Sequence, residues 1–230
     1  MLPGLFTRIV DFNGSLIRNI KGIRTSQHLF DDLANSDAEH ALATLAAEQD
    51  YIDTRAALLT RPFDYGAVIT YPFVAQNWQA SRFSDGARYG VWYGSQAIET
   101  TVYETVYHWR RFVDDSFAGY DDEIRADRRV FTARCRGILV DLQGKEVDFP
   151  GLIDPKSYVF THAAGDYLKS QRQNGCLVKS ARSDGINAAI LAADVLSDAK
   201  DLCYLTYLFT PAKKDATRVI RERRKLWMTI

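Results

Sequence analysis

Short apolar runs, separated by glycine, proline and polar turns, recur along the chain and predict strands. Residues 5–12 are apolar enough for a first short strand, and Ala67–Tyr71 predicts a second. Gly90–Gly94 predicts another strand between two glycines, and residues 130–142 predict a long strand or a bent pair of strands. The other predicted strands lie later in the chain, at Cys176–Ala181, Asn187–Ala193, Leu202–Phe209 and 218–230, the last with a charged outer face.

Apolar residues spaced by three and four mark the helices, because 3.6 residues make one helical turn. The capping box Ser36–Glu39 predicts a helix from about residue 37 into the fifties. Ser95 is the predicted N-cap of a second helix. Asp154-Pro155 predicts the start of a third helix, which ends at Asn174-Gly175. The buried stripe of the second helix is expected to consist of Ile98, Val102, Val106, Trp109 and Val113.

A few helices among many short strands predict an α+β sheet protein. No internal repeat or low-complexity linker divides the sequence, so we expect residues 1–230 to form a single domain. Hydrophobic residues make up 47% and charged residues 25% of the chain, which is ordinary for a globular protein. Lys+Arg and Asp+Glu both number 29, so the net charge offers no general attraction to nucleic acids or anionic membranes.

The N-terminus lacks the basic and apolar segments of a secretory signal, and no apolar run approaches the roughly 18 residues of a membrane-spanning helix. The cysteines Cys135, Cys176 and Cys203 are far apart, odd in number and without metal-ligand spacing. We therefore expect a reduced, cytoplasmic protein without a metal or a membrane anchor.

The segment Ser81–Gly94 carries the densest candidate chemistry, with three glycines among arginines and aromatic residues. Glycines let backbone N–H groups approach a ligand, and the guanidinium of Arg82 offers a fork of donors suited to phosphate oxygens. The rings of Tyr89, Trp92 and Tyr93 offer stacking surfaces for a planar heterocycle. These features suit a nucleotide diphosphate, although an ordinary surface loop that packs into a strand has the same composition.

Glu104 lies on the side of its predicted helix that faces away from the buried stripe. Thr100, His108 and Arg111 share this side. A glutamate in such a position is either a solvated residue, paired with His108 four residues later, or part of a site that the helix presents.

The segments Arg82–Gly86, Gly90–Tyr93 and Glu99–His108 together resemble the hallmark of the RES-domain family. A second element, Val178–Arg182 followed by Gly185–Ala189, resembles the Ser-x-Arg and Gly-x-Asn element of that family, and Leu139–Leu142 resembles the strand between the two. The similarity covers roughly residues 67–210 in the right order. On this basis residues 67–210 are the expected core, and about 15–65 is an N-terminal helical elaboration whose role the sequence leaves open.

The resemblance implies an ADP-ribosyltransferase-like mixed β-sheet core with flanking helices, and NAD as the substrate. Family members are toxins of bacterial toxin–antitoxin pairs that cleave the nicotinamide–ribose bond, with water or phosphate as acceptor, or that transfer ADP-ribose to a protein. The implied partner is an Xre-type antitoxin in a hetero-oligomeric complex.

Carried over by motif, the family's catalytic residues fall on Arg82, Tyr93, Glu104 and Ser180. Arg82 would hold a diphosphate or an incoming phosphate, and Tyr93 would stack on nicotinamide or fix the ribose. Glu104 would stabilise the positive charge that develops on the ribose carbon. Ser180 would contact the nicotinamide side or orient Glu104.

Arg8, Arg88 and Arg182 are further candidates for contact with the dinucleotide, each also compatible with a solvated or structural role. His108 belongs to the motif and is expected to support Glu104 rather than to act in catalysis. Three functions stay open: an NAD-depleting enzyme, an ADP-ribosyltransferase with a specific protein target, and a catalytically silent protein-binding module. Direct binding of nucleic acid ranks below all three.

Overall fold

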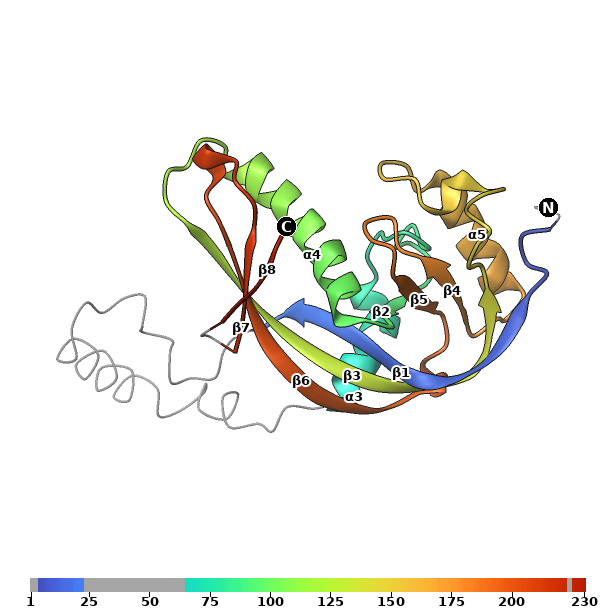
Figure 1. Ribbon diagram of the computed structural model, residues 1–230. Coiled ribbons are helices and arrows are strands. Elements are labelled where there is room, and N and C mark those ends of the chain that lie inside the picture. The colour runs from blue at the N-terminus through green and yellow to red at the C-terminus, as the bar shows by residue number, and fades with distance from the viewer. Residues whose placement is uncertain (1–3, 23–64, 223–224) are drawn as a thin grey trace. The chain divides into compact units, whose positions relative to one another are not determined.

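Eight strands in the described part of the chain form one mixed sheet, in the order β1-β2-β5-β4-β3-β6-β7-β8 (Figure 1). The computed structural model describes residues 4–22, 65–222 and 225–230. The unit built from Met1–Lys21 and Tyr65–Ile230 carries every helix and strand named below. The strands are β1 (Ile9–Lys21), β2 (Trp92–Ser95), β3 (Ile124–Asp141), β4 (Gly175–Lys179), β5 (Ile186–Ile190), β6 (Leu196–Phe209), β7 (Arg218–Arg221) and β8 (Lys225–Thr229).

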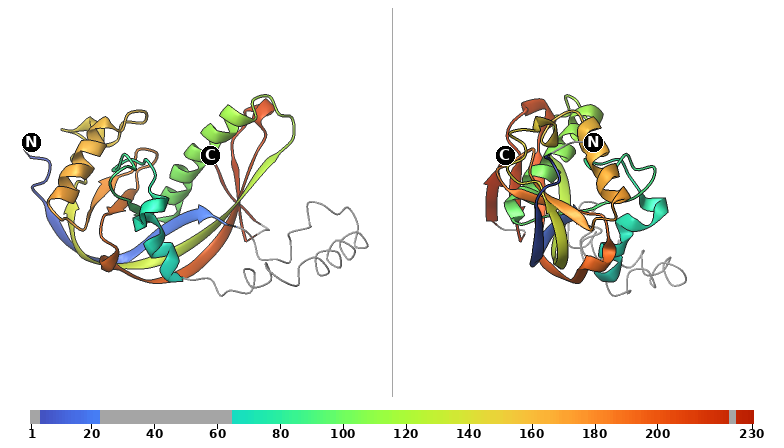
Figure 2. Two further views of the ribbon diagram at one scale, coloured as in Figure 1. Left: turned by 180° about the vertical axis from the view of Figure 1, so that it is seen from behind. Right: turned by 90° about the vertical axis from the view of Figure 1, so that its right-hand side faces the viewer.

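Three α-helices accompany the sheet in the described residues: α3 (Tyr65–Thr70), α4 (Ile98–Ser116) and α5 (Val159–Ser170). Short 3-10 helices join them, at Tyr71–Phe73, Ala75–Asn77, Pro150–Leu152, Ala193–Val195 and Pro211–Lys213. The long strands β1, β3 and β6 curve, and α4 and α5 lie on the inner side of that curve (Figures 1 and 2). No helix among the described residues is long and apolar enough to cross a membrane.

The longest pairing in the sheet joins β1 to β3 without interruption, from Ile9 opposite Val140 to Lys21 opposite Arg128. Because β1 also pairs with β2, the strands β1, β2, β5, β4 and β3 form a closed ring of pairings. Within this ring only the β3–β4 pair is parallel. Strands β6, β7 and β8 extend the sheet from the edge of β3 that lies opposite β1.

Strands β1 and β2 touch at a single residue pair, Ile17 opposite Ser95. Beyond Ile17 the edge of β1 that faces β2 has no strand of the described residues beside it, and α4 packs against β1. This divergence of β1 from β2 positions the candidate site described below.

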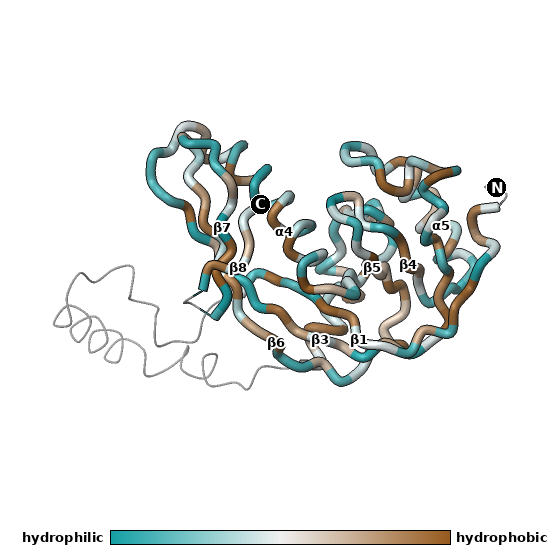
Figure 3. Tube along the Cα trace, viewed as in Figure 1, coloured by the Kyte–Doolittle hydropathy of each residue, from teal (hydrophilic) through white to brown (hydrophobic). Residues whose placement is uncertain are grey.

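Three buried clusters hold the unit together. One lies between α5 and the end of the sheet and includes Leu168, Val178 and Leu142. A second fills the ring of strands around Trp92 and Phe131. The third joins the stripe of α4 to β3, β6 and β7. Figure 3 shows the corresponding alternation of hydrophobic and hydrophilic stretches along the long strands.

The predicted α+β class, with a mixed sheet and flanking helices, is confirmed. The predicted helix with the apolar stripe is α4, in which Val102, Val106 and Val113 are buried. The predicted long strand is β3, and the three later runs correspond to β4, β5 and β6. The first strand is longer and later than expected, because β1 runs from Ile9 to Lys21 and so takes in the start of the expected elaboration.

Three local predictions are wrong. Ala67–Tyr71 is helical, in α3 and the 3-10 turn that follows it, because Ile69 packs into the second cluster and α3 lies against β6. Ser95 belongs to β2, and the N-cap of α4 is Ala97. Residues 218–230 form two antiparallel strands, β7 and β8, rather than one.

The helix predicted from Asp154-Pro155 starts later, since α5 begins at Val159. The Asp154 carboxylate accepts hydrogen bonds from the amides of Lys156 and Ser157 in a turn that precedes the helix. After the helix the left-handed residue is Arg172, with a φ of 54°, whereas Gly175 opens β4. The predicted helix from residue 37 and its capping box lie outside the described residues.

Candidate active site

A cavity of about 370 Å³ lies where β1 and β2 diverge. Its walls come from β1, β2, α4 and the loop before β2, so residues far apart in the sequence meet there. The lining residues from these four elements are Ile17, Arg18, Asn19, Ile20, Ala80, Ser81, Arg82, Phe83, Tyr93, Gly94, Ser95, Thr101, Glu104, Thr105 and His108. Tyr158, Val178 and Asn187 complete the lining.

Glu104 is the one carboxylate among the described residues that line the cavity. Its Oε1 atom accepts two hydrogen bonds, from the Ser180 hydroxyl at 2.6 Å and from the Asn187 Nδ2 amide at 2.8 Å. No described residue donates to Oε2 in a hydrogen bond of the structure. The carboxylate is thus held by one oxygen, and its other oxygen is available to a ligand.

The Ser180 hydroxyl orients Glu104 rather than facing the cavity. Its oxygen accepts hydrogen bonds from the backbone amides of Arg182, at 3.0 Å, and Ser183, at 3.2 Å. Both acceptor positions of the hydroxyl are therefore occupied, and its single proton goes to Glu104. Ser180 is buried and does not line the cavity, which favours the second of the two roles that the sequence allowed.

Asn187 performs the same task from β5 and was missed as a site residue. The Ser95 hydroxyl donates to the Asn187 Oδ1 atom at 2.6 Å, which turns the Nδ2 amide toward Glu104. Sequence reasoning placed Asn187 in the Gly-x-Asn element but assigned it no role. Its use becomes visible only when β5 pairs with β2 and brings Asn187 opposite Ser95.

Tyr93 lines the cavity, but its hydroxyl group is occupied by the loop that carries Arg82. It accepts a hydrogen bond from the Phe83 amide at 2.7 Å and donates to the Ser81 hydroxyl at 3.1 Å. Burial raises the pKa of Tyr93 above its usual range, so the phenol stays neutral. Tyr93 therefore positions residues 81–83 through its hydroxyl and offers its ring to the cavity.

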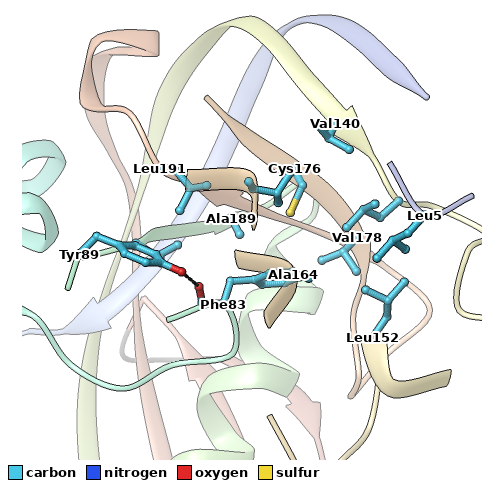
Figure 4. Packing of buried hydrophobic residues seen from close by; sticks show 13 residues of the cluster. Leu5, Phe83, Tyr89, Val140, Leu152, Ala164, Cys176, Val178, Ala189 and Leu191 are labelled. Atoms are coloured by element: carbon cyan, nitrogen blue, oxygen red, sulfur yellow. Dashed lines mark hydrogen bonds between the residues drawn. The ribbon is translucent and has the colours of Figure 1, made fainter. Parts of the chain in front are cut away.

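The same loop is anchored in the first cluster by Phe83, which is buried beside Ala164 and Val178 (Figure 4). The Tyr89 hydroxyl donates to the Phe83 carbonyl at 2.9 Å. Gly165 on α5 lets the helix approach the loop, because a Cβ atom at this position would lie 2.0 Å from the Phe83 carbonyl oxygen. The loop is consequently a rigid part of the fold and not a free surface segment.

Arg82 lies on the wall of the cavity with three contacts that fix its guanidinium. It donates to the carbonyls of Leu152 and Asp154, at 3.3 and 3.0 Å, both through Nη1. The ring of Tyr158 lies 4.7 Å from the guanidinium carbon. The Nε and Nη2 donors take part in none of these contacts, so Arg82 retains donors for an anion.

Arg18 is a second cation of the cavity wall, and sequence reasoning missed it. Its Nη1 atom is buried and has no hydrogen-bond partner among the described residues, and the guanidinium lies 5.2 Å from the centre of the Trp92 ring. Burial lowers the pKa of Arg18 to about 10, so the side chain is still charged at neutral pH. A partly buried cation with an unpaired buried donor is a strong candidate for holding an anionic ligand group. A strand prediction extended through residue 21 would have included it.

Arg8 and Arg88 do not line the cavity. Arg8 is half exposed and pairs with Asp141 at 2.8 Å. Arg88 bridges Asp85 and Asp166, at 3.1 and 2.5 Å, on the outside of the loop. Both therefore have the solvated, structural role that the sequence allowed as the alternative.

Arg182 lies near the cavity but outside its lining. It donates to the Pro155 carbonyl at 2.6 Å, and its guanidinium stacks 3.4 Å from the centre of the Tyr107 ring. His108 lines the exposed rim of the cavity. Partial desolvation lowers the pKa of His108, and the charges of Arg182, Arg111 and Arg82 lower it further, whereas Glu104 opposes the shift.

The structure thus brings Arg82, Tyr93 and Glu104 to one cavity, with Ser180 directly behind Glu104. Two arginines and a single carboxylate line the cavity, so the balance of charge favours an anionic ligand. The aromatic rings of Tyr93 and Tyr158 provide flat apolar surfaces beside these charges.

The chain is similar to known proteins over most of its length. The RES domain family model matches residues 55–210. Among solved structures, a chain of the M. tuberculosis MbcT–MbcA toxin–antitoxin complex is similar, with 12% sequence identity and a TM-score of 0.46 over 89% of this chain and 88% of that chain. No curated protein matches the sequence.

Proposed function

Because the chain belongs to the RES-domain family, we propose that it cleaves the bond between nicotinamide and ribose in NAD and so depletes this dinucleotide. One observation carries the proposal: Glu104, with a free carboxylate oxygen, and the cations Arg18 and Arg82 line the same cavity. The cations match the two negative charges of a diphosphate, and the carboxylate matches a cationic transition state.

The reaction needs little acid catalysis, because nicotinamide already departs as a neutral molecule. When the bond between C1′ of the ribose and the ring nitrogen breaks, both electrons go to nicotinamide and positive charge develops on the ribose. The Oε2 atom of Glu104 would accept a hydrogen bond from a ribose hydroxyl and stabilise this charge, while Ser180 and Asn187 hold Oε1. Water then adds to C1′ and releases a proton, or a phosphate oxygen adds in its place.

Arg18 and Arg82 would hold the diphosphate, and Tyr93 would support the arrangement in two ways. Its hydroxyl fixes the Arg82 loop, and its ring provides a face for the nicotinamide or the ribose. Holding the dinucleotide at its diphosphate places the scissile bond beside Glu104, which makes the reaction effectively unimolecular.

The family resemblance supports a biological role as the toxin of a toxin–antitoxin pair that acts on cytoplasmic NAD. We propose that an antitoxin protein of the Xre type forms a complex with the chain and suppresses its activity. Expression of the chain without that partner should lower cellular NAD and stop growth.

A nicotinamide-release assay with purified, antitoxin-free protein tests the proposal. We expect wild-type protein to release nicotinamide and Glu104→Gln, which keeps the shape of the side chain but loses its charge, to be at least 100-fold slower, equivalent to about 2.7 kcal/mol. Equal rates for the two proteins, or no release by the wild type, would contradict it. In a separate incubation of the protein with labelled NAD and a cell lysate, label that stays on one protein band would indicate ADP-ribosyl transfer instead.

A further inference from the structure

A chain of four hydrogen-bonded polar side chains, three of them buried, leads from the wall of the cavity into the protein. Asn19 and Thr105 line the cavity, whereas Tyr207 and Arg128 lie behind them on β6 and β3. Asn19 and Arg128 are each 8% exposed, and Tyr207 is fully buried. Buried polar groups are costly unless they are paired, so the pattern of these contacts deserves a physical explanation.

The hydrogen bonds of this chain all point the same way, with each donor on the Arg128 side and each acceptor on the Thr101 side. Arg128 donates through Nε to the Asn19 Oδ1 atom at 2.9 Å and through Nη2 to the Asn19 carbonyl at 3.1 Å. Asn19 Nδ2 donates to the Tyr207 hydroxyl at 2.8 Å, and this hydroxyl lies 2.8 Å from the Thr105 Oγ1 atom. Thr105 in turn donates to the Thr101 carbonyl at 2.7 Å.

Arg128 determines this direction because a guanidinium can only donate. The Asn19 amide must therefore turn its oxygen toward Arg128 and its nitrogen toward Tyr207. The Tyr207 hydroxyl accepts from that nitrogen, so its own proton goes to Thr105, whose proton is already given to Thr101. No carboxylate in the described part of the chain forms an ion pair with Arg128, whose guanidinium donates to Asn19 and lies 5.7 Å from the centre of the Tyr207 ring.

The Asn19 amide has a second N–H that takes part in none of these bonds. Because Asn19 lines the cavity, this donor is available there. We infer that Asn19 is a further substrate-binding residue, which donates to an oxygen of the dinucleotide, and that Arg128 and Tyr207 are positioning residues that hold its amide in the donating orientation.

The inference rests on the proposed function and adds a contact on the β1 wall of its cavity. Asn19 and Arg18, successive residues of β1, both line the cavity, so the donor and the cation assigned to the diphosphate border the same space. The ligand oxygen is accordingly one of the ADP-ribose part of NAD, not of nicotinamide. This choice allows binding to be measured with ADP-ribose itself, without turnover.

Calorimetric titration of ADP-ribose tests the assignment. Asn19→Ala should raise the Kd about 10-fold, as expected for loss of one hydrogen bond to a charged group. Tyr207→Phe, which removes only the hydroxyl, should raise it about 3- to 5-fold by releasing the amide. In the Asn19→Ala background, Tyr207→Phe should have no further effect on the Kd, because Tyr207 acts only through Asn19. Tyr204→Phe, on the same strand but in none of these bonds, is the matched control.

The possible outcomes separate this inference from the proposed function. If wild-type protein releases nicotinamide while Asn19→Ala binds ADP-ribose as tightly as wild type, the role of Asn19 is refuted and the proposed function stands. If Tyr207→Phe weakens binding equally in both backgrounds, its effect is a general loss of structure and the positioning role is refuted. If wild-type protein neither binds ADP-ribose nor consumes NAD, both are refuted.

Discussion

The hydrogen bond from Asn187 to Glu104 provides a sharp test of how the active site is organised. Asn187→Ala removes the donor at 2.8 Å from Oε1 and leaves the Ser180 hydroxyl, at 2.6 Å, in place. A hydrogen bond to a charged group contributes about 1.5–3 kcal/mol. Since about 1.4 kcal/mol corresponds to a factor of ten in rate, and one donor remains, we expect kcat to fall about 10- to 50-fold.

The loss should appear in kcat and not in KM. In the proposed mechanism Glu104 stabilises charge that exists only in the transition state, whereas the proposed ground-state contacts of Arg18 and Arg82 are unchanged. Nicotinamide release measured over a range of NAD concentrations separates the two parameters. Ser95→Ala should have a smaller effect, because Ser95 only orients the Asn187 amide.

Asn187→Asp extends the test, because it replaces the donor by a second carboxylate of nearly the same shape. Two carboxylates at this distance cannot both stay ionised without a large cost, so activity should fall further than in Asn187→Ala. A thermal unfolding curve for each variant controls for loss of folded protein. A kcat within twofold of wild type for Asn187→Ala, or a change confined to KM, would refute the proposed organisation of Glu104.

Two further predictions concern Arg8, Arg88 and His108. Arg8→Ala and Arg88→Ala should leave kcat/KM within twofold of wild type, since both residues form exposed ion pairs away from the cavity. Such ion pairs contribute only about 0–1 kcal/mol to stability. A tenfold loss of activity in either variant would show that its arginine belongs to the active site. The lowered pKa of His108 predicts that the folded protein loses stability on acidification. Above about pH 6.5, the usual pKa of histidine, the imidazole is neutral in the folded and the unfolded chain. Below this pH the unfolded chain binds the proton more readily than the folded chain, so unfolding is favoured. Melting temperatures between pH 7.5 and 5.5 should therefore depend less on pH in His108→Gln, and an unchanged dependence would contradict the shift.

Features encoded by near neighbours could be predicted from the sequence. The stripe of α4 placed Glu104 on the opposite side of the helix from Val102, and the structure shows that side turned toward the cavity. The glycine-rich loop was identified by its composition, and Arg82 and Tyr93 as site residues by the family motif. Periodicity and motif spacing predict which side of a helix or strand a residue occupies, because both depend on near neighbours in the sequence and not on tertiary contacts.

Contacts between distant residues were decided by the tertiary structure alone. Ser95 had the residue type of an N-cap, yet in the fold its hydroxyl meets Asn187, 92 positions away. Ala67–Tyr71 had the composition of a strand but forms a helix, because packing against β6 outweighs a weak local preference. Arg18 lines the cavity, and the expected Arg8 does not. The extent and pairing of β1 depend on β3, more than a hundred residues later in the sequence. Local sequence thus determined which chemical groups the chain carries, and long-range strand pairing decided which of them face the same cavity.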